Sequence, residues 1–369
     1  MVYVASLNKD LIFSAVRAMY TDVARHPERE YHFPTGRAAC IFVGYPAARL
    51  AEMPAVAVES FAGVAYPFAA NVIGEGDTVL DIGSGSGTDV LLAARTVGDR
   101  GYAIGLDMTA AMLEKLATCV TAAGVSNVRL LEGNAEKIPL PDASVDVVTS
   151  NGVLNLVPDK RAALAEIHRV LKPGGRVQIG DIALGQPLSG DCLSNPTLWA
   201  ECIVGATLED EYLAMLQQSG FTYIEALGRL DYFSASVSAA TRSIAQSFHA
   251  RSVVLRAAKP PTGPLPPALH WPASAEAAHT QPRPSPVTEQ ASAPVANATL
   301  EGYGQSCGAL EPQMRLKMRA LESGQILEVR ADDPTARLGV PAWSRLTGHA
   351  LVATIEEDSH RTRFFLRKR

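Results

Sequence analysis

The sequence predicts an α/β protein with a largely parallel sheet covered by helices on both faces, followed by a small α+β unit. Three observations lead to this prediction. Strand and helix patterns alternate from residue 69 to residue 182, which is typical of βαβ units. A glycine-rich turn, Gly83 to Gly87, follows the first strand. A stretch rich in Pro, Ala, Ser and Thr, residues 259–298, is predicted to be a disordered linker between domains 1–258 and 299–369.

Composition and charge narrow the functional classes. The chain has 369 residues, of which 47% are hydrophobic, enough for a sizeable core and two or three domains. A net charge of −5 and a pI near 5.9 give no basic surface for nucleic acid. No apolar run is long enough for a secretion signal or a membrane span, so a cytoplasmic location is expected. Five cysteines without zinc-site spacing predict reduced thiols and no metal site.

Ahead of the sheet, apolar residues recur at helical spacing from residue 8 to residue 25. The next segment, Tyr31 to Arg37, is rich in aromatic and turn residues and is interpreted either as a lid over a binding site or as a packed connector. His32 in this segment is a candidate proton acceptor, with a structural role as the alternative. The sequence therefore does not decide between a lid and a packed connector.

The remaining elements of the first domain follow from periodicity and from glycine and proline stops. Predicted strands occupy residues 78–81, 101–107, 128–136, 144–150 and 175–181, and predicted helices follow the glycine turn and occupy residues 110–123 and 160–171. Two closing strands, at 223–230 and 251–257, flank a helix at 239–248. Alternation of this kind places the strands in one sheet.

The glycine turn carries the first indication of function. An apolar strand ends at Asp81, and Gly83, Gly85 and Gly87 precede a helix. Glycine lets the main chain approach a ligand closely, and the first N–H groups of the helix are free donors. A dinucleotide fingerprint needs its third glycine one position later, where Thr88 stands. The turn therefore predicts a nucleotide-type ligand and disfavours a nicotinamide cofactor.

Polar residues end the next three strands. Asp107 comes about 20 residues after the turn, where a carboxylate can accept both hydroxyls of a ribose. Asn134 and Glu136 are small polar groups suited to the edge of an adenine, and Asn151 ends the fourth strand. Because ligands of open parallel sheets bind outside the carboxyl ends of the strands, these side chains are expected to converge.

Four motifs, in this order, resemble those of class I S-adenosylmethionine-dependent methyltransferases. They are Asp81-x-Gly-x-Gly-x-Gly87, Leu106-Asp-Met-Thr109, Gly133-Asn-Ala-Glu136 and Arg169-Val-Leu-Lys-Pro-Gly-Gly175. The resemblance implies a Rossmann-like seven-stranded sheet and S-adenosylmethionine as cofactor. The cofactor-binding residues it implies are Asp81, Gly83, Gly85, Gly87, Asp107, Met108, Asn134, Ala135 and Asn151.

Within this class, residues 40–230 resemble the arsenite methyltransferases, through Gly63-Val-Ala-Tyr-Pro67, Ser150 to Lys160 and Leu198 to Ala206. That branch binds As(III) through thiolates. Its motif Gly-Cys-Gly-x-Pro has a cysteine where this chain has Val64. Its frequent motif Ser-Asn-Cys has a cysteine where this chain has Gly152. Cys202 keeps its place and is the candidate catalytic residue, with an inert buried cysteine as the alternative. Glu59 and Tyr66 flank the expected substrate loop, which lies just ahead of the first strand, and both are candidates for contact with the cofactor.

Residues 299–369 resemble the TusA-like sulfur carriers. The resemblance lies in Cys307 ahead of a helix, then Asp332-Asp-Pro334, Pro341-Ala-Trp343 and Thr347-Gly-His349. The family's Cys-Pro-x-Pro is here Cys307-Gly-Ala-Leu-Glu-Pro312, with two additional residues. The predicted two-layer α+β sandwich has helices at 312–321 and 341–347 and strands at 326–330, 351–355 and 361–366. Cys307 is the candidate sulfur carrier, and sulfur-relay proteins are possible partners.

Three functions remain open from the sequence. A single thiolate does not supply the several sulfur donors that make As(III) binding tight. Together with the carrier domain, this favours methyl transfer to sulfide or a small thiol. The first alternative is methylation of As(III) that arrives bound to small thiols. The second is a non-catalytic sulfur-relay adaptor that uses bound S-adenosylmethionine as a signal.

Overall fold

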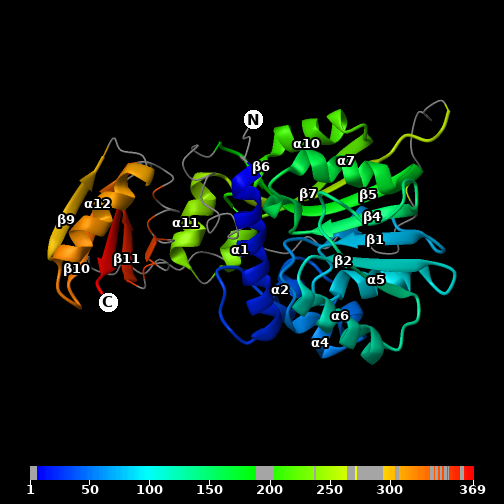
Figure 1. The fold of residues 1–369 in the computed structure, drawn as a ribbon, viewed down its shortest axis with the longest axis horizontal. Coiled ribbons are helices and arrows are strands. Elements are labelled where there is room, and N and C mark those ends of the chain that lie inside the picture. The colour runs from blue at the N-terminus through cyan, green and yellow to red at the C-terminus, as the bar shows by residue number, and fades with distance from the viewer. Residues whose placement is uncertain are drawn as a thin grey trace.

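The computed structural model describes residues 6–187, 203–236, 238–263, 271, 294–303, 307–332, 336, 340, 343–344, 347, 349–357 and 361–369. Within these residues the strands form two separate sheets, a large one in the first domain and a small one near the C-terminus (Figure 1). No helix in the described part is both long enough and apolar enough to span a membrane.

The large sheet has the strand order β3-β2-β1-β4-β5-β8-β7. Its strands are β1 (Thr78–Ile82), β2 (Tyr102–Asp107), β3 (Val128–Glu132), β4 (Val145–Asn151), β5 (Leu171–Leu184), β7 (Thr222–Leu230) and β8 (Arg251–Ala258). β1 to β5 are parallel, and β8 is antiparallel to both of its neighbours. A short β6 (Thr207–Leu208) pairs with the end of β5. The predicted Rossmann-like sheet is confirmed, with seven strands in its continuous order and the short β6 as an eighth.

Helices cover both faces of this sheet. α5 (Thr88–Val97) and α6 (Ala110–Ala123) pack on one face, and α7 (Lys160–Val170) and α10 (Glu209–Gln218) lie on the other (Figure 1). Buried aliphatic side chains of the strands fill both layers; Leu80, Val148 and Ile179, for example, pack beneath α7 and α10. α10 was not predicted, because its acidic first turn, Glu209 to Glu211, weakens the amphipathic pattern.

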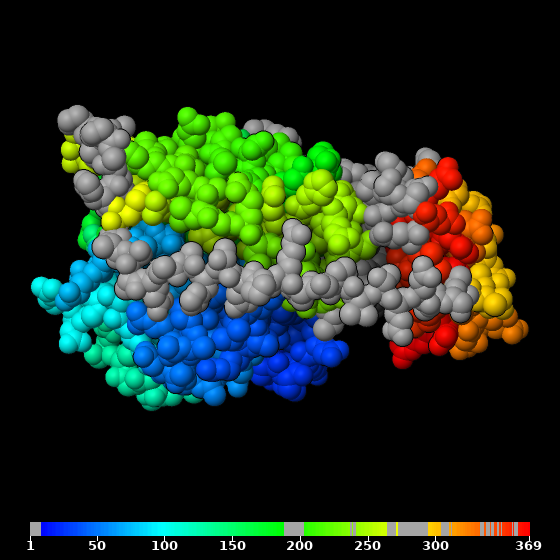
Figure 2. Space-filling view, turned by 180° about the vertical axis from the view of Figure 1, so that it is seen from behind, coloured from blue at the N-terminus to red at the C-terminus, as the bar shows by residue number. Residues whose placement is uncertain are grey.

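An N-terminal helical layer packs against the segment that follows β5. The layer consists of α1 (Ser6–Arg25), α2 (Gly36–Phe42), α3 (Ala47–Ala51), α4 (Ala55–Glu59) and the short 3-10 helix η1 (Pro67–Ala70). Its apolar side chains share one core with η3 (Tyr232–Ala235) and α11 (Ala239–Ser247). The ring centroids of Phe42 and Tyr232, for example, are 6.4 Å apart. In Figure 2 the blue N-terminal surface adjoins the green surface of this later segment.

The segment from Tyr31 to Arg37 forms part of this layer. The Tyr31 ring stacks on Phe33 at 5.7 Å, and its hydroxyl donates to Asp22. The carbonyl of His32 accepts a hydrogen bond of 2.9 Å from the Ser236 hydroxyl. These contacts favour the packed connector over the lid.

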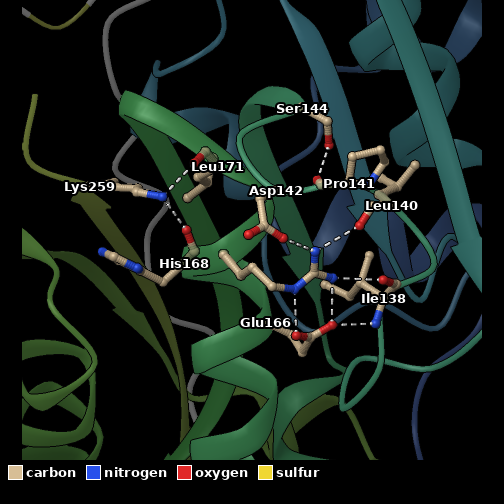
Figure 3. A network of polar contacts seen from close by, with 10 residues as sticks. Ile138, Leu140, Pro141, Asp142, Ser144, Glu166, His168, Leu171 and Lys259 are labelled. Carbon is tan, nitrogen blue, oxygen red and sulfur yellow. Dashed lines mark hydrogen bonds and ion pairs between the residues drawn. The ribbon is translucent and has the colours of Figure 1, made fainter. Parts of the chain in front are cut away.

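The Arg169 motif is structural in this fold. Arg169 belongs to α7, and Figure 3 shows Glu166 of the same helix together with Ile138, Leu140 and Asp142 of the loop that its guanidinium contacts. The guanidinium donates to the carboxylates of Glu166 and Asp142 at 2.7 Å each, and to the carbonyls of Ile138 and Leu140 at 2.9 and 2.8 Å. The hydrogen bond from Arg169 is the main cause that lowers the pKa of Glu166. One side chain thus fixes the loop between β3 and β4.

Replacement of Arg169 by methionine is expected to lower the free energy of unfolding by about 2 kcal/mol, because it removes the hydrogen bonds from the guanidinium to two carbonyls and two carboxylates. The lowered pKa of Glu166 means that this stabilisation is present at neutral pH and is lost as pH falls through the folded pKa. Urea unfolding should therefore show a smaller difference in the free energy of unfolding between wild type and Arg169→Met at pH 4 than at pH 7. Arg100→Ala is the control, since its ion pair with Glu75 is largely exposed and contributes about 0.5 kcal/mol or less.

The small sheet has the order β11-β12-β10-β9. Its strands are β9 (Ala298–Gly302), β10 (Ile326–Ala331), β11 (Ala350–Glu356) and β12 (Thr362–Arg367). β12 is antiparallel to β10 and β11, and β9 is parallel to β10. α12 (Cys307–Ala320) packs on one face of this sheet, which agrees with the predicted two-layer sandwich.

The prediction that this helix begins at Pro312 is wrong, because α12 begins at Cys307 and contains the proline. Leu310, Met314 and Met318 are buried in the small core at successive helical turns. Burial of Leu310 therefore extends the helix towards its N-terminus, past the point where a proline would favour a start.

The predicted linker begins and ends in ordered contacts. Lys259 donates to the carbonyls of His168 and Leu171 at 2.8 and 2.7 Å, a contact also drawn in Figure 3. The guanidinium of Arg256 lies 4.3 Å from the ring centroid of Trp271. At the other end, β9 begins at Ala298. Disorder of the residues between stays a prediction.

Candidate active site

A pocket lies at the carboxyl ends of β1, β2 and β4 in the large sheet. Its walls come from the glycine turn, from residues 107–109, 133–135 and 151–153 after the next strands, and from residues 60–63. Its cavity volume is about 120 Å³, and the empty space that includes its open mouth is about 950 Å³. The predicted convergence of strand ends is confirmed by this geometry.

The glycine turn exposes main chain to the pocket. Gly83 has a φ of +69°, and a Cβ there would lie 2.2 Å from Val153 Cγ2. Gly85 has a φ of +51°, and a Cβ there would meet no atom within 4 Å. Gly87 is not part of the wall, since it packs against Leu116. Gly85 thus leaves room for a ligand directly against the main chain, as the predicted nucleotide site requires.

Asp107 closes one side of this turn. Its Oδ2 accepts from Gly85 N at 2.9 Å, and its Oδ1 accepts from Thr109 N at 2.8 Å. Burial raises the pKa of Asp107, and these main-chain hydrogen bonds oppose the rise. Each carboxylate oxygen has a second acceptor site, so the residue is held in place and can still accept from two ligand hydroxyls. The geometry fits the predicted ribose contact.

Two buried polar atoms next to the turn have no hydrogen-bond partner in the described part of the chain. They are Asp81 Oδ2 and Ser84 Oγ. Ser84 lines the pocket, whereas Asp81 lies behind the wall. Burial raises the pKa of Asp81, and the charges of Asp89 and Asp107 add to this. Unsatisfied buried atoms call for a partner, and of these two residues only Ser84 lines the pocket, where a ligand has access to its hydroxyl.

Met108, Asn134 and Ala135 line the pocket as predicted, but Glu136 does not. Asn134 Oδ1 accepts from the N–H groups of Glu136 and Lys137 at 2.9 and 3.1 Å, which fixes the turn. The Glu136 carboxylate turns elsewhere, since it accepts from Lys9 and from Asp159 N. The assignment of Glu136 to an adenine edge is therefore wrong, because α1 and α7 provide it with stronger partners.

Asn151 also lines the pocket, and all its polar atoms are engaged. Its Oδ1 accepts from the N–H groups of Val64 and Ala65 at 2.8 and 3.1 Å. Its Nδ2 lies within 3.0 Å of Ala65 O, Asp89 Oδ2 and Tyr45 Oη. Asn151 thus fastens the loop after α4 to the end of β4, and its predicted cofactor contact remains a proposal.

Two family models match the chain. The "Methyltransferase domain" model covers residues 73–220, and the "Sulfurtransferase TusA" model covers residues 300–368. The chain therefore joins an S-adenosylmethionine-dependent methyltransferase domain to a TusA-like domain. The glycine turn and Asp107 both lie within the first match, and α12 and the small sheet provide most of the second.

Curated relatives agree with the methyltransferase domain. An arsenite methyltransferase of Halobacterium salinarum is 40% identical over 163 residues, which are 44% of this chain and 42% of the relative. The Mus musculus arsenite methyltransferase is 36% identical over 152 residues, 39% of this chain and 40% of the relative. The chain thus spans less than half the length of these relatives. An arsenic(III) S-adenosylmethionine methyltransferase from Chlamydomonas reinhardtii superposes with a TM-score of 0.45 at 29% identity, covering 62% of this chain and 76% of that chain.

Three sequence-predicted residues lie away from the pocket wall of the methyltransferase domain. Glu59 is at the surface and forms an ion pair with Lys115 at 2.7 Å. The Tyr66 ring packs on Tyr45, with centroids 4.7 Å apart. His32 packs edge-on against Phe33. None of the three lines the pocket, so the structure does not bring them together with the cofactor-binding residues.

The structure places two of the cysteines of the methyltransferase domain, Cys40 and Cys119. Cys202 and Cys192 lie outside the described residues, so the predicted role of Cys202 stays a proposal. Cys40 and Cys119 are buried and have no thiol in the pocket wall. Burial raises the pKa of Cys119 to about 11, and it raises the pKa of Cys40 further. Both are buried core residues.

Sequence reasoning missed one whole wall of the pocket. Phe13, Val16 and Tyr20 of α1 line it, and Arg17 Nε donates to Met108 O at 3.3 Å. These three side chains have helical spacing, so the sequence indicates an amphipathic helix. It does not indicate that this helix packs across the pocket. Asp89, in the first turn of α5, was also missed.

Proposed function

We propose that the protein transfers a methyl group from S-adenosylmethionine to a soft nucleophile, sulfide or a small thiol. The observation that carries the proposal is the contact between Gly152 and Val64. A Cβ on Gly152 would lie 3.2 Å from Val64 Cγ1, so the two positions at which the resembled arsenite branch carries cysteines are neighbours here, and both lack a thiol. Among described residues the pocket wall contains no cysteine.

The residues of the pocket have separate tasks in this proposal. The main chain around Gly85 and the Asp107 carboxylate bind the cofactor's polar groups, and Met108 and Ala135 border it. S-adenosylmethionine supplies an electrophilic methyl group. The apolar side chains of α1 exclude water, and the loop of residues 60–63 borders the space left for the acceptor. Alignment of acceptor and methyl group provides much of the rate enhancement of such a displacement.

The TusA-like domain supports sulfur as the acceptor element. Its helix α12 begins at Cys307, the position that the resemblance assigns to sulfur carriage. We propose that sulfur-relay proteins load Cys307 as a persulfide and that its terminal sulfur accepts the methyl group, which gives a methyl disulfide on Cys307. A small-molecule thiol then reduces this disulfide, releases methanethiol and restores the Cys307 thiol. Cys307→Ser should then abolish methylation of sulfur from a persulfide donor and leave methylation of a free thiol intact.

A second candidate function is methylation of arsenite, favoured by the 40% identity to an arsenite methyltransferase. Headspace mass spectrometry separates the two. Purified protein receives S-adenosylmethionine with sulfide, methanethiol, or arsenite plus glutathione, and Asp107→Ala serves as the cofactor-deficient control. Volatile methyl sulfides without methylated arsenic are the expected result. Methylated arsenic alone would refute the proposal, and cofactor binding without any product would favour the non-catalytic adaptor.

A further inference from the structure

A closed triangle of hydrogen bonds lies at the acceptor end of the pocket. Asp89 Oδ1 accepts from the Tyr45 hydroxyl at 2.5 Å, and Asp89 Oδ2 accepts from Asn151 Nδ2 at 3.0 Å. Asn151 Nδ2 is also 2.9 Å from the Tyr45 oxygen. The three residues come from α5, from the end of β4 and from the turn between α2 and α3. Asp89 is 6% exposed and faces the pocket.

The triangle stands beside the loop that borders the acceptor space. A Cβ on Gly63 would lie 2.4 Å from Asn151 Nδ2, and both residues line the pocket together with Gly152. Asp107, by contrast, is tied to Gly85 on the glycine-turn side. The two carboxylates of the wall therefore serve different parts of the pocket.

Methylation of a neutral thiol releases a proton. The titratable side chains among the described wall residues are Tyr20, Asp89 and Asp107. A phenol has an ordinary pKa near 10 and is protonated at neutral pH, so Tyr20 is not a proton acceptor there. Asp107 is placed to bind the ribose. Asp89 is the remaining carboxylate, and each of its oxygens keeps an acceptor site beyond the hydrogen bond that it already has.

We propose that Asp89 accepts the thiol proton during methyl transfer, with Tyr45 and Asn151 as positioning residues. This inference rests on the proposed function. The S–H bond breaks and its proton passes to an Asp89 oxygen, while the sulfur pair forms the bond to the methyl carbon. The bond from that carbon to the cofactor sulfur breaks, and its electron pair stays on the cofactor sulfur. Solvent takes the proton from Asp89 after the product leaves.

The electrostatic surroundings fit this role. Burial raises the pKa of Asp89 to about 6, against the lowering effect of the hydrogen bonds from Tyr45 and Asn151. The titratable groups that interact with it are Tyr45, Cys40 and Asp81, and the pKa of each is raised, mainly by burial. Asp89 is thus mainly ionised at pH 7 and more basic than an exposed carboxylate.

The test compares wild type, Asp89→Asn and Tyr45→Phe on thiols of graded acidity. Asparagine at this position can keep the two hydrogen bonds that Asp89 makes to Tyr45 and Asn151, if the Tyr45 oxygen becomes the acceptor. Asp89→Asn should lower kcat by roughly 10²-fold for alkyl thiols with a pKa near 8.5. It should lower kcat by less than about threefold for aryl thiols that are already ionised at the assay pH, because these need no base.

The pH profile adds a measurement that a purely structural role would not change. Tyr45→Phe removes a hydrogen bond that lowers the pKa of Asp89, so the acid limb of kcat should move to higher pH. In Asp89→Asn that limb should disappear. Calorimetry should find S-adenosylmethionine affinity within about threefold of wild type for both variants. An equal loss of kcat for acidic and weakly acidic thiols would overturn the inference. A wild type that methylates no thiol would instead refute the proposed function, and the inference with it.

Discussion

Asp107→Ala is expected to weaken S-adenosylmethionine binding by about 10²-fold or more. The proposal assigns two cofactor hydroxyls to this carboxylate, and hydrogen bonds to a charged group are each worth about 1.5–3 kcal/mol. Because 1.4 kcal/mol is a tenfold change in affinity, two such bonds set this magnitude. The variant also frees the N–H of Gly85, which Asp107 now holds at 2.9 Å, so the glycine turn loses part of its preorganisation.

Titration calorimetry with S-adenosylmethionine measures this effect directly. Asp107→Asn should bind with intermediate affinity, since it keeps one acceptor and loses the charge. Asp99→Ala is the matched control, because Asp99 is an exposed aspartate in the loop before β2 and lies outside the pocket wall. Thermal unfolding without ligand separates a loss of fold from a loss of affinity. Unchanged affinity of a folded Asp107→Ala protein would mean that the ribose is held elsewhere.

The features that the sequence predicted well depend on local spacing. The glycine turn, Asp107 and the alternation of strands and helices follow from patterns within short windows, and the chain has little freedom to place them otherwise. The Asn134 turn shows the limit of this reasoning. Its neighbour Glu136 has the right residue type at a strand end, yet Lys9, 127 residues away, binds it. Side-chain partners far apart in sequence decide such cases.

The acceptor end of the pocket could not be predicted for the same reason. Tyr45 and Asn151 are 106 residues apart, and Tyr45 and Asp89 are 44 apart. No short motif joins them, so Asp89 appeared only as a helix residue after the glycine turn. Glu59 and Tyr66 were chosen because they flank the loop, and His32 was chosen as a possible proton acceptor. Each has a contact partner outside the pocket wall instead. Packing of α1 across the pocket likewise depends on tertiary contacts.

The double variant Val64→Cys, Gly152→Cys is expected to gain arsenite binding. As(III) affinity rises with the number of thiolate donors, so the variant should bind arsenite on the order of tenfold or more tightly than wild type. The two positions are close enough to share one ion, since a Cβ on Gly152 would lie 3.2 Å from Val64 Cγ1. Gly152 has a φ of +72°, and a cysteine there costs about 1–2 kcal/mol of stability. Val64→Cys removes one of the methyl groups that crowd the new side chain.

Equilibrium dialysis with a phosphine reductant, which contributes no thiol, measures arsenite binding, and mass spectrometry quantifies the arsenic. The double serine variant has nearly the same shape without sulfur and should bind no better than wild type. If the serine variant bound arsenite as well as the cysteine variant, binding would not depend on these positions. If wild type already bound arsenite stoichiometrically without added thiol, the absence of cysteines at 64 and 152 would no longer argue for a sulfur acceptor. A gain confined to the cysteine variant would instead mean that two side chains separate sulfur from arsenic specificity on one methyltransferase scaffold.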